Sequence, residues 1–258
     1  MHTRSSWCWC CACRVRRRRR VAIALLIAII AVAVSAHDRA HSGRSRPTHA
    51  SSARTEPART PTPARTPAGP GVMSLATAGQ GLSWMNFDGM QLPVSATNGP
   101  RDIRGGLASE FADTPRGALL AAINIGVRTA AQWGTAIFRP TITRQVTGPD
   151  AAALLRAETS TYAQLRAAAR VRSGHPAGRG YAAEAGYRFV TWSPASATVD
   201  VVTAGPTASG ATALASTRVQ ILWQRGDWRV IAPPGGNWAN AAIAISSLTG
   251  YTTFPGKR

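Results

Sequence analysis

Residues 219–230 read VQILWQRGDWRV and hold the clearest structural signal in the chain. Apolar side chains occupy every second position up to Trp223, which is the period of a half-buried strand. An Arg-Gly-Asp turn follows at residues 225–227, and the alternation resumes with Trp228 on one face and Arg229 on the other. The stretch therefore predicts a β-hairpin that turns both tryptophans toward a core.

Two earlier stretches show the same period of two. Residues 187–192 and 197–202 alternate along the chain, and glycine and proline between 205 and 210 mark a turn before the hairpin. Asp200 alternates with two valines, so its carboxylate is expected to face solvent. Together with the hairpin, these runs predict a curved antiparallel meander.

Two amphipathic helices are expected before the meander. Asp113 supplies an N-cap and Pro115 stands at the first helical position. A second, alanine-rich helix begins at Asp150 and runs to about Val171. Residues 133–146 are expected to add a shorter turn of helix. The residues of the second helix predicted to face inward are Ala151, Leu155, Tyr162, Leu165 and Ala169.

The end of the chain is predicted to leave the sheet. The Pro-Pro-Gly-Gly sequence at 233–236 ends the meander, because proline cannot donate to a β-ladder. Residues 238–248 are then expected to form a short closing helix.

Residues 37–79 are predicted to be a disordered linker. Between residues 37 and 71 the chain has six prolines, six arginines and no hydrophobic period. Such a stretch cannot bury enough apolar area to offset the entropy of ordering it. Its prolines favour an extended spacer, and the folded domain is expected to span residues 80–256.

A membrane-targeting element precedes the linker. Six arginines between positions 14 and 20 lead into an apolar run, 21–36, whose length lies between a signal-peptide core and a spanning helix. The Arg block favours an uncleaved anchor with residues 1–20 as a cytoplasmic leader, while small residues before His37 leave signal cleavage open. Both alternatives place the domain outside the cytoplasm, as a single-pass membrane protein or as a secreted one.

The formal charge of +19 is uneven along the chain. Residues 1–70 carry 13 Arg and two acidic residues, and the remainder is only moderately basic. We attribute the arginine excess to codon usage, because every basic residue except Lys257 is Arg. The folded part also has no basic stripe with interleaved aromatic side chains. Nucleic acid is therefore not expected as a partner.

All four cysteines lie in the leader, at positions 8, 10, 11 and 13. Their crowded spacing leaves three interpretations open: a zinc site, acylation beside the membrane, and a start codon assigned too far upstream. The domain itself has one histidine, His175, and no cysteine. No metal site, cofactor site or Cys/His nucleophile is therefore predicted.

An enzymatic interpretation would depend on Asp200. If this aspartate pointed into the domain near Tyr162 or Tyr187, burial would raise its pKa and suit it to shuttle a proton. Its expected solvent-facing position argues against that role, and the other acidic residues share no motif that pairs carboxylates. No catalytic residue is predicted, and the chain is expected not to be an enzyme.

Helices followed by a meander that ends in the 219–230 hairpin resemble the cone-shaped α+β fold of nuclear transport factor two and the cystatin-like superfamily. Residues 186–203 and 232–238 are similar to uncharacterised actinobacterial membrane proteins linked with mobile elements. An anchor, a Pro-rich spacer and a cone also resemble the assembly-factor subunit of type IV secretion and conjugation machines. The resemblance implies a role in an assembly and carries no catalytic motif.

The expected fold is therefore α+β, with N-terminal helices packed on a curved antiparallel sheet. The expected function is a non-enzymatic scaffold anchored in the membrane through residues 21–36, which contacts other envelope proteins or further copies of itself in a conjugation or envelope-transport assembly. The alternative is a cone that binds a small molecule or lipid in the cell wall space, either as a binding protein or as an isomerase-like enzyme. An apolar cavity with an inward Asp or Tyr favours the alternative, and a filled interior with an exposed apolar patch favours the scaffold.

Overall fold

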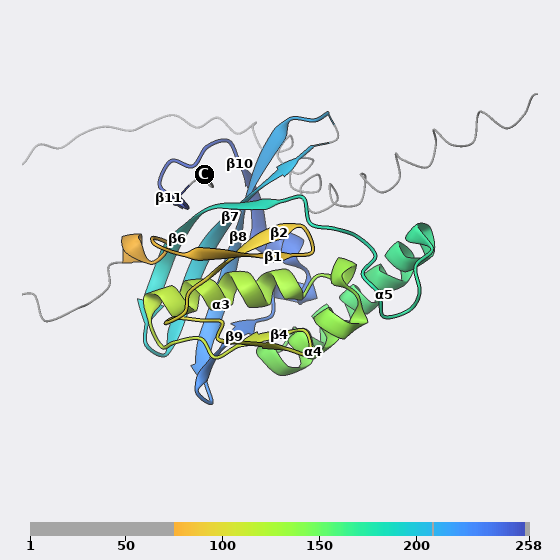
Figure 1. Cartoon of the computed structure of the whole chain (residues 1–258), viewed down its shortest axis with the longest axis horizontal. Helices are drawn as coiled ribbons and strands as arrows, with labels where there is room; N and C mark the ends of the chain where they lie inside the picture. Colours follow the sequence, from red (N-terminus) through yellow and green to blue (C-terminus); the bar gives the residue numbers. More distant parts are fainter. Residues whose placement is uncertain (1–74, 208, 256–258) are drawn as a thin grey trace, which may run out of the picture.

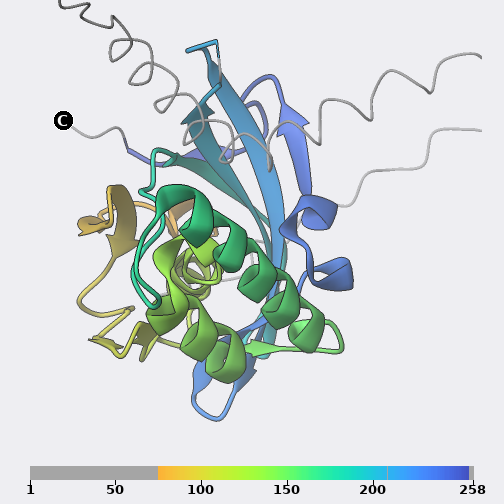
Figure 2. The same cartoon turned by 90° about the vertical axis from the view of Figure 1, so that its right-hand side faces the viewer.

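The computed structural model describes residues 75–207 and 209–255, which form an α+β fold (Figure 1). Within these residues, three α-helices lie against a seven-stranded sheet. Figure 2 shows the three helices on the same side of the sheet. The sequence predicted this class, with helices packed on a sheet.

The centre of the sheet is an antiparallel meander of four strands, as predicted. Its members are β6 (Ala183–Ser193), β7 (Ser196–Pro206), β8 (Thr212–Gln224) and β9 (Asp227–Ile231). Short strands complete the sheet: β11 (Thr252–Thr253) pairs with β6, β10 (Ala242–Ile245) with β8, and β5 (Val146–Thr147) with β9. The β5–β9 pairing is parallel, so the sheet is mixed and not purely antiparallel as predicted. Strand β5 directly follows a helix and enters the sheet in the same direction as β9.

Two hairpins precede the first α-helix of the described residues, where helices were expected to come first. They are formed by β1 (Ser83–Phe87) with β2 (Met90–Val94), and by β3 (Asp102–Arg104) with β4 (Leu107–Ser109). The available signal was the dipeptide Asp88-Gly89, whose φ angles of 46° and 96° suit a two-residue hairpin turn.

The folded region begins before residue 80. After the short 3-10 helix η2 (Leu75–Thr77), Ala78 is completely buried. The Tyr187 hydroxyl accepts a hydrogen bond from Gly79 N at 2.8 Å and donates one to Ala76 O at 2.9 Å. These bonds join the start of the domain to β6.

Helix α3 (Pro115–Arg128) is the central helix of the core. Its N-cap is Thr114, whose Oγ1 accepts from Gly117 N at 3.0 Å, so the predicted cap at Asp113 is one residue too early. Most of α3 is buried, because the sheet covers one side while other helices and the β1–β4 hairpins cover the rest.

Two further helices pack beside α3. Helix α4 (Thr135–Gln145), preceded by the 3-10 helix η3 (Ala131–Trp133), confirms the shorter helix expected in this region. Helix α5 (Ala151–Ala169) buries Leu154 and Tyr162. Tyr162 was predicted to face inward and Leu154 was not. Ala169 is exposed, contrary to the prediction, because the last turns of α5 extend beyond the sheet (Figure 1).

The prediction of a closing helix over residues 238–248 is wrong beyond the first turn. After the 3-10 turns η4 (Pro234–Gly236) and η5 (Trp238–Ala241), the chain enters β10, whose Ala-Ile-Ala-Ile sequence pairs with β8. Isoleucine favours a strand. The N-terminal half of β8 is not covered by β9, so it can hydrogen-bond with β10.

The predicted leader (1–20), the anchor (21–36) and most of the linker (37–79) lie outside the described residues. Within the part of the chain that is described, no helix is both long and apolar enough to cross a membrane.

Trp228 anchors the hairpin to the helices, as predicted. Its side chain is buried, its Nε1 donates to Ala112 O at 3.0 Å, and its ring lies 5.2 Å from the ring of Trp223 and 5.8 Å from that of Trp192. Trp223 points the same way but is only partly buried. Trp228 therefore contributes more to the core than Trp223.

We expect Trp228→Ala to lower the free energy of unfolding by about 3 to 5 kcal/mol, the range for emptying an aromatic core position. The control Arg229→Ala, in the same strand and directed to the other face, should change it by less than about 0.5 kcal/mol. Chemical denaturation of both variants measures the difference. Unchanged stability in Trp228→Ala, with loss of association to a partner, would show instead that the indole belongs to an interface.

Candidate ligand-binding site

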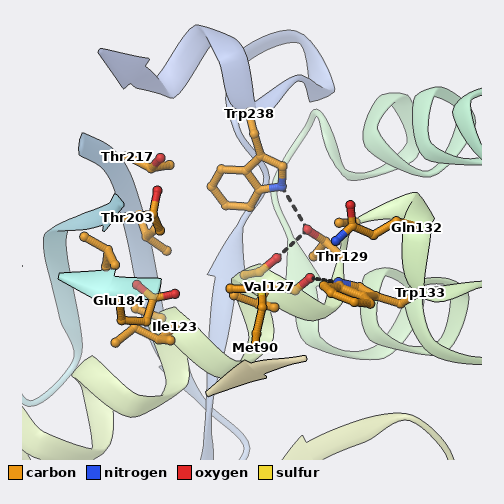
Figure 3. Close-up of a pocket in the computed structure, with 15 residues that line it drawn as sticks. Met90, Ile123, Val127, Thr129, Gln132, Trp133, Glu184, Thr203, Thr217 and Trp238 are labelled. Carbon is orange, nitrogen blue, oxygen red and sulfur yellow. Dashed lines mark hydrogen bonds between the residues drawn. The ribbon is translucent and has the colours of Figure 1, made fainter. Parts of the chain in front are cut away.

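A cavity of about 200 Å³ lies between the end of α3 and the inner face of the sheet (Figure 3). Strands β2, β6, β7 and β8 and helices α3, η3 and η5 all contribute to it. Its lining residues are Met90, Ala122, Ile123, Gly126, Val127, Thr129, Ala130, Gln132, Trp133, Glu184, Val201, Thr203, Thr217, Val219 and Trp238. Most of this lining is apolar, as is typical of small-molecule sites.

The sheet side of the cavity carries a row of polar side chains. Glu184 pairs with Thr203 across β6 and β7, and Val201 pairs with Thr217 across β7 and β8. Directly paired residues share a face of the sheet, so these side chains all project toward the helices. Figure 3 shows Glu184, Thr203 and Thr217 in this row.

The helix side of the cavity presents carbon surfaces. Trp133 Nε1 donates to Val127 O at 2.6 Å, and Trp238 Nε1 donates to Thr129 Oγ1 at 2.9 Å. Thr129 Oγ1 in turn donates to Gly126 O at 2.7 Å. Because both indole N–H groups are used at the end of α3, the rings offer a ligand their carbon faces.

Gly126 leaves part of the cavity open. A Cβ atom built at this position meets no atom within 4 Å, although the residue has an ordinary helical conformation. Alanine would suit a helix better than glycine here by up to about 1 kcal/mol. The absent side chain therefore keeps space free beside the cavity at some expense of helix stability.

Glu184 is the one ionisable side chain among the lining residues. It is buried, and within the described residues its Oε2 has no hydrogen-bond partner. Burial raises the pKa of Glu184 from its ordinary 4.5 to about 8. The carboxyl group is therefore mostly protonated at neutral pH, with an unsatisfied oxygen in an apolar site.

Glu184 faces the cavity because β6 contains a β-bulge. The pairing passes from Glu184 opposite Thr203 to Gly186 opposite Val202, which leaves Ala185 as an extra residue. Without it, strict alternation from Tyr187 would put Glu184 on the outer face. Bulges commonly re-aim a side chain in this way. This is why the alternating pattern of the sequence did not identify Glu184 as a site residue.

A second acid, half-buried on α5, supports the wall of the cavity. Glu158 on α5 accepts a hydrogen bond from Ala131 N at 2.8 Å, at the start of η3. Burial raises the pKa of Glu158 to about 7, although this hydrogen bond acts in the opposite direction. Glu158 thus ties α5 to the segment that carries Gln132 and Trp133.

Asp200, the proton-shuttle candidate of the sequence, is buried on the outer face, and the prediction that it faces solvent is wrong. The strand alternation was right, but directly opposite residues cover it: Arg218 Nε lies 2.8 Å from Asp200 Oδ1, and Arg188 Nη2 lies 2.7 Å from Oδ2. Burial alone would raise the pKa of Asp200, but hydrogen bonds from the two arginines outweigh it and lower the pKa.

The other candidates also lie away from the cavity. The Tyr162 hydroxyl donates to His175 O at 2.9 Å, and the Tyr187 hydroxyl is held by the start of the domain. The side chain of His175 is exposed in its loop. Among the described residues, no group of His, Cys, Asp and Glu side chains is placed to hold a metal ion.

The sequence pattern of one protein family, described as a domain of unknown function (DUF8175), matches residues 45–253. The chain belongs to this family. The matched region includes every residue that lines the cavity and extends into the segment predicted to be a linker. Neither the curated proteins nor the solved structures contain a match to this chain.

The raised pKa values of Glu184, which is buried, and Glu158, which is half-buried, give the domain a pH-dependent stability. A carboxyl whose pKa is raised by folding stabilises the folded state below its unfolded pKa, and this contribution is lost as the pH rises through the folded pKa. The free energy of unfolding should therefore fall between about pH 4.5 and pH 8, by an amount on the order of a few kcal/mol.

We expect Glu184→Gln to flatten this decline, most clearly near pH 8, because the amide does not ionise. Denaturation at a series of pH values measures the effect. Glu158→Gln should remove the part of the decline near pH 7, and the exposed Glu110→Gln should leave the profile unchanged. A wild-type profile that is flat from pH 4.5 to 8 would contradict the burial of both acids.

Proposed function

We propose that this domain binds a small, mostly apolar molecule in the cavity beside α3. The observation that carries the proposal is Glu184, a buried carboxyl with an unpartnered oxygen in an apolar cavity of about 200 Å³. Native proteins satisfy nearly all buried polar groups, so an exception inside a cavity points to a bound partner. An inward acid in an apolar cavity is also the arrangement that favours ligand binding over a filled scaffold domain.

Two features of the site lower the stability of the empty domain. The unpaired carboxyl loses its hydration without gaining a hydrogen bond, which costs about 1 to 3 kcal/mol. Gly126 weakens the end of α3 and keeps space open. A ligand that fills this space and hydrogen-bonds Glu184 would offset both losses, because binding to the folded state stabilises it.

The proposal is one of binding rather than catalysis. The acid-base candidates Asp200, Tyr162 and Tyr187 contribute no side chain to the lining of the cavity. Thr203 and Thr217 supply hydroxyl groups that can hydrogen-bond a ligand.

We further propose that the helices and meander form a cone of the kind seen in the cystatin-like superfamily, held outside the cytoplasm by residues 21–36. A role in an envelope or conjugation assembly stays a prediction. The large exposed apolar side chains of the described residues are Leu75, Ile103, Tyr181, Val190 and Ile243. Ligand binding is the function that the geometry supports better, because the unpartnered Glu184 carboxyl lines the cavity.

The test uses 3,3-dimethylbutan-1-ol, a small neutral alcohol with a compact apolar end, as the probe. Titrated into the purified full chain, it should shift the indole resonances of Trp133 and Trp238 in a saturable way. Gly126→Leu should abolish the shift, because the new side chain fills the cavity. The control Ala152→Leu, on an exposed turn of α5, should leave it unchanged.

Gly126→Ala gives a second, graded test. This variant should raise the free energy of unfolding by about 0.4 to 1 kcal/mol, because alanine has fewer unfolded conformations and meets no clash here. It should also weaken binding of the alcohol. No saturable shift in the wild type, or equal binding in Gly126→Leu, would refute the proposed function.

A further inference from the structure

The cavity is electrostatically unusual for this chain. The sequence has 30 Lys and Arg residues against 11 Asp and Glu residues, yet the only ionisable side chain in the lining is an acid. A site for an anionic ligand would place arginine in the lining, since guanidinium groups bind carboxylate and phosphate. The composition of the lining therefore excludes anions as the preferred ligand.

The charged side chains on the neighbouring elements do not line the cavity. On α3, Arg128 Nη1 donates to Asn124 O and Oδ1, both at 2.9 Å, and the guanidinium lies 4.4 Å from the ring centre of Phe87, while Nη2 has no hydrogen-bond partner among the described residues. At the start of the same helix, Arg116 Nε donates to Ala78 O at 3.1 Å. The carboxylate of Asp200 on β7 points to the outer face. The described residues thus provide Glu184 with no cation of their own.

The aromatic walls suit a cation as well. Figure 3 shows the Trp238 ring beside Thr203 and Thr217, with Trp133 beyond Val127 and Thr129. Both rings have their N–H groups bonded to the protein, so a ligand in the cavity contacts ring carbons rather than indole donors. Tryptophan is the strongest cation–π partner among the side chains, and aromatic walls commonly bind quaternary ammonium groups.

Binding of a neutral ligand does not require an ionisable side chain at position 184. Thr203 and Thr217 already supply hydroxyl donors, and a neutral side chain at position 184 would avoid the penalty of burying an ionisable group. A cation changes this balance, because it stabilises the ionised carboxylate and supplies the partner that Oε2 lacks. The acid then contributes to binding rather than opposing folding.

The size of the cavity limits the ligand. Its volume of about 200 Å³ lies below the roughly 300 to 1,000 Å³ of sites for drug-sized molecules. The buried part of the ligand is therefore a compact group, such as a nitrogen that carries three methyl groups.

We propose that the ligand carries a small alkylated ammonium group, which binds between the Glu184 carboxylate and the rings of Trp133 and Trp238. This inference rests on the proposed function and specifies its ligand class. When the ligand binds, the Glu184 carboxyl releases its proton to solvent. The ligand itself is held without a covalent bond.

The test compares choline with 3,3-dimethylbutan-1-ol, its neutral isostere in which carbon replaces the ammonium nitrogen. Calorimetric or NMR titrations of the full chain at pH 8.5 should show choline binding at least tenfold more tightly than the alcohol. In Glu184→Gln the affinity for choline should fall at least tenfold, and by more than the affinity for the alcohol, because glutamine can still hydrogen-bond a ligand but carries no charge. The control Glu110→Gln alters an exposed acid that does not line the cavity, and it should leave both affinities as in the wild type.

The pH dependence gives an independent readout. Choline keeps its charge at every pH, and Glu184 is the only titratable side chain in the lining, but Glu158 lies behind the wall at Ala131 and burial raises its pKa to about 7. The titration therefore uses Glu158→Gln as its background, in which the affinity for choline should fall about tenfold from pH 7 to pH 6, as the proton competes more strongly for Glu184. The alcohol should show no such fall.

The outcomes separate the two proposals. If the alcohol binds as tightly as choline, or if choline binding ignores both pH and Glu184→Gln, the cation inference is wrong and the binding function stands. If neither probe binds saturably, both proposals are wrong.

Discussion

One extra residue in strand β6 determines the chemistry of the cavity. Ala185 interrupts the ladder between β6 and β7, and Glu184 consequently shares the inner face with Tyr187 instead of facing outward. The end of the chain holds this bulge in place: Phe254 N donates to Ala185 O at 3.2 Å, and β11 pairs with the next two residues. A Cβ on Gly186 would lie 2.9 Å from Thr252 O, so glycine permits this close approach. The C-terminal segment and the orientation of Glu184 therefore depend on each other.

The other half of the site depends on where α3 ends. At the end of the helix, Thr129 Oγ1 and Trp133 Nε1 donate to the carbonyls of Gly126 and Val127, and Trp238 Nε1 donates to Thr129 Oγ1. The same contacts fix the walls of the cavity and turn the aromatic rings toward it. A rigid frame with one unsatisfied acid is suited to a small ligand, because little conformational entropy is lost on binding.

The sequence predicted the parts of the fold that follow a simple period. The hairpin around Trp228 was recognised because its alternation is unbroken, and the helices were recognised by their caps and spacing. Glu184 was not predicted as a site residue, because a bulge changes the face of the sheet on which a side chain lies and leaves no pattern in the sequence. A second irregularity, between Phe189 and Thr191, likewise places Trp192 against Trp228 rather than on the outer face. Asp200 was misjudged for a different reason: periodicity assigns a face, whereas burial depends on partners in adjacent strands, here Arg188 and Arg218.

The central claim, that Glu184 is buried and unpaired in the empty cavity, is tested most directly by a carbon-13 NMR titration of the glutamate carboxyl groups. The chain contains few glutamates, and loss of one signal in Glu184→Gln identifies the resonance. Because burial raises the pKa of Glu184 to about 8, the midpoint expected without ligand lies well above the ordinary 4.5, near pH 8. A midpoint near the ordinary 4.5 would mean that the carboxyl reaches solvent or an internal partner, and would contradict this description of the site.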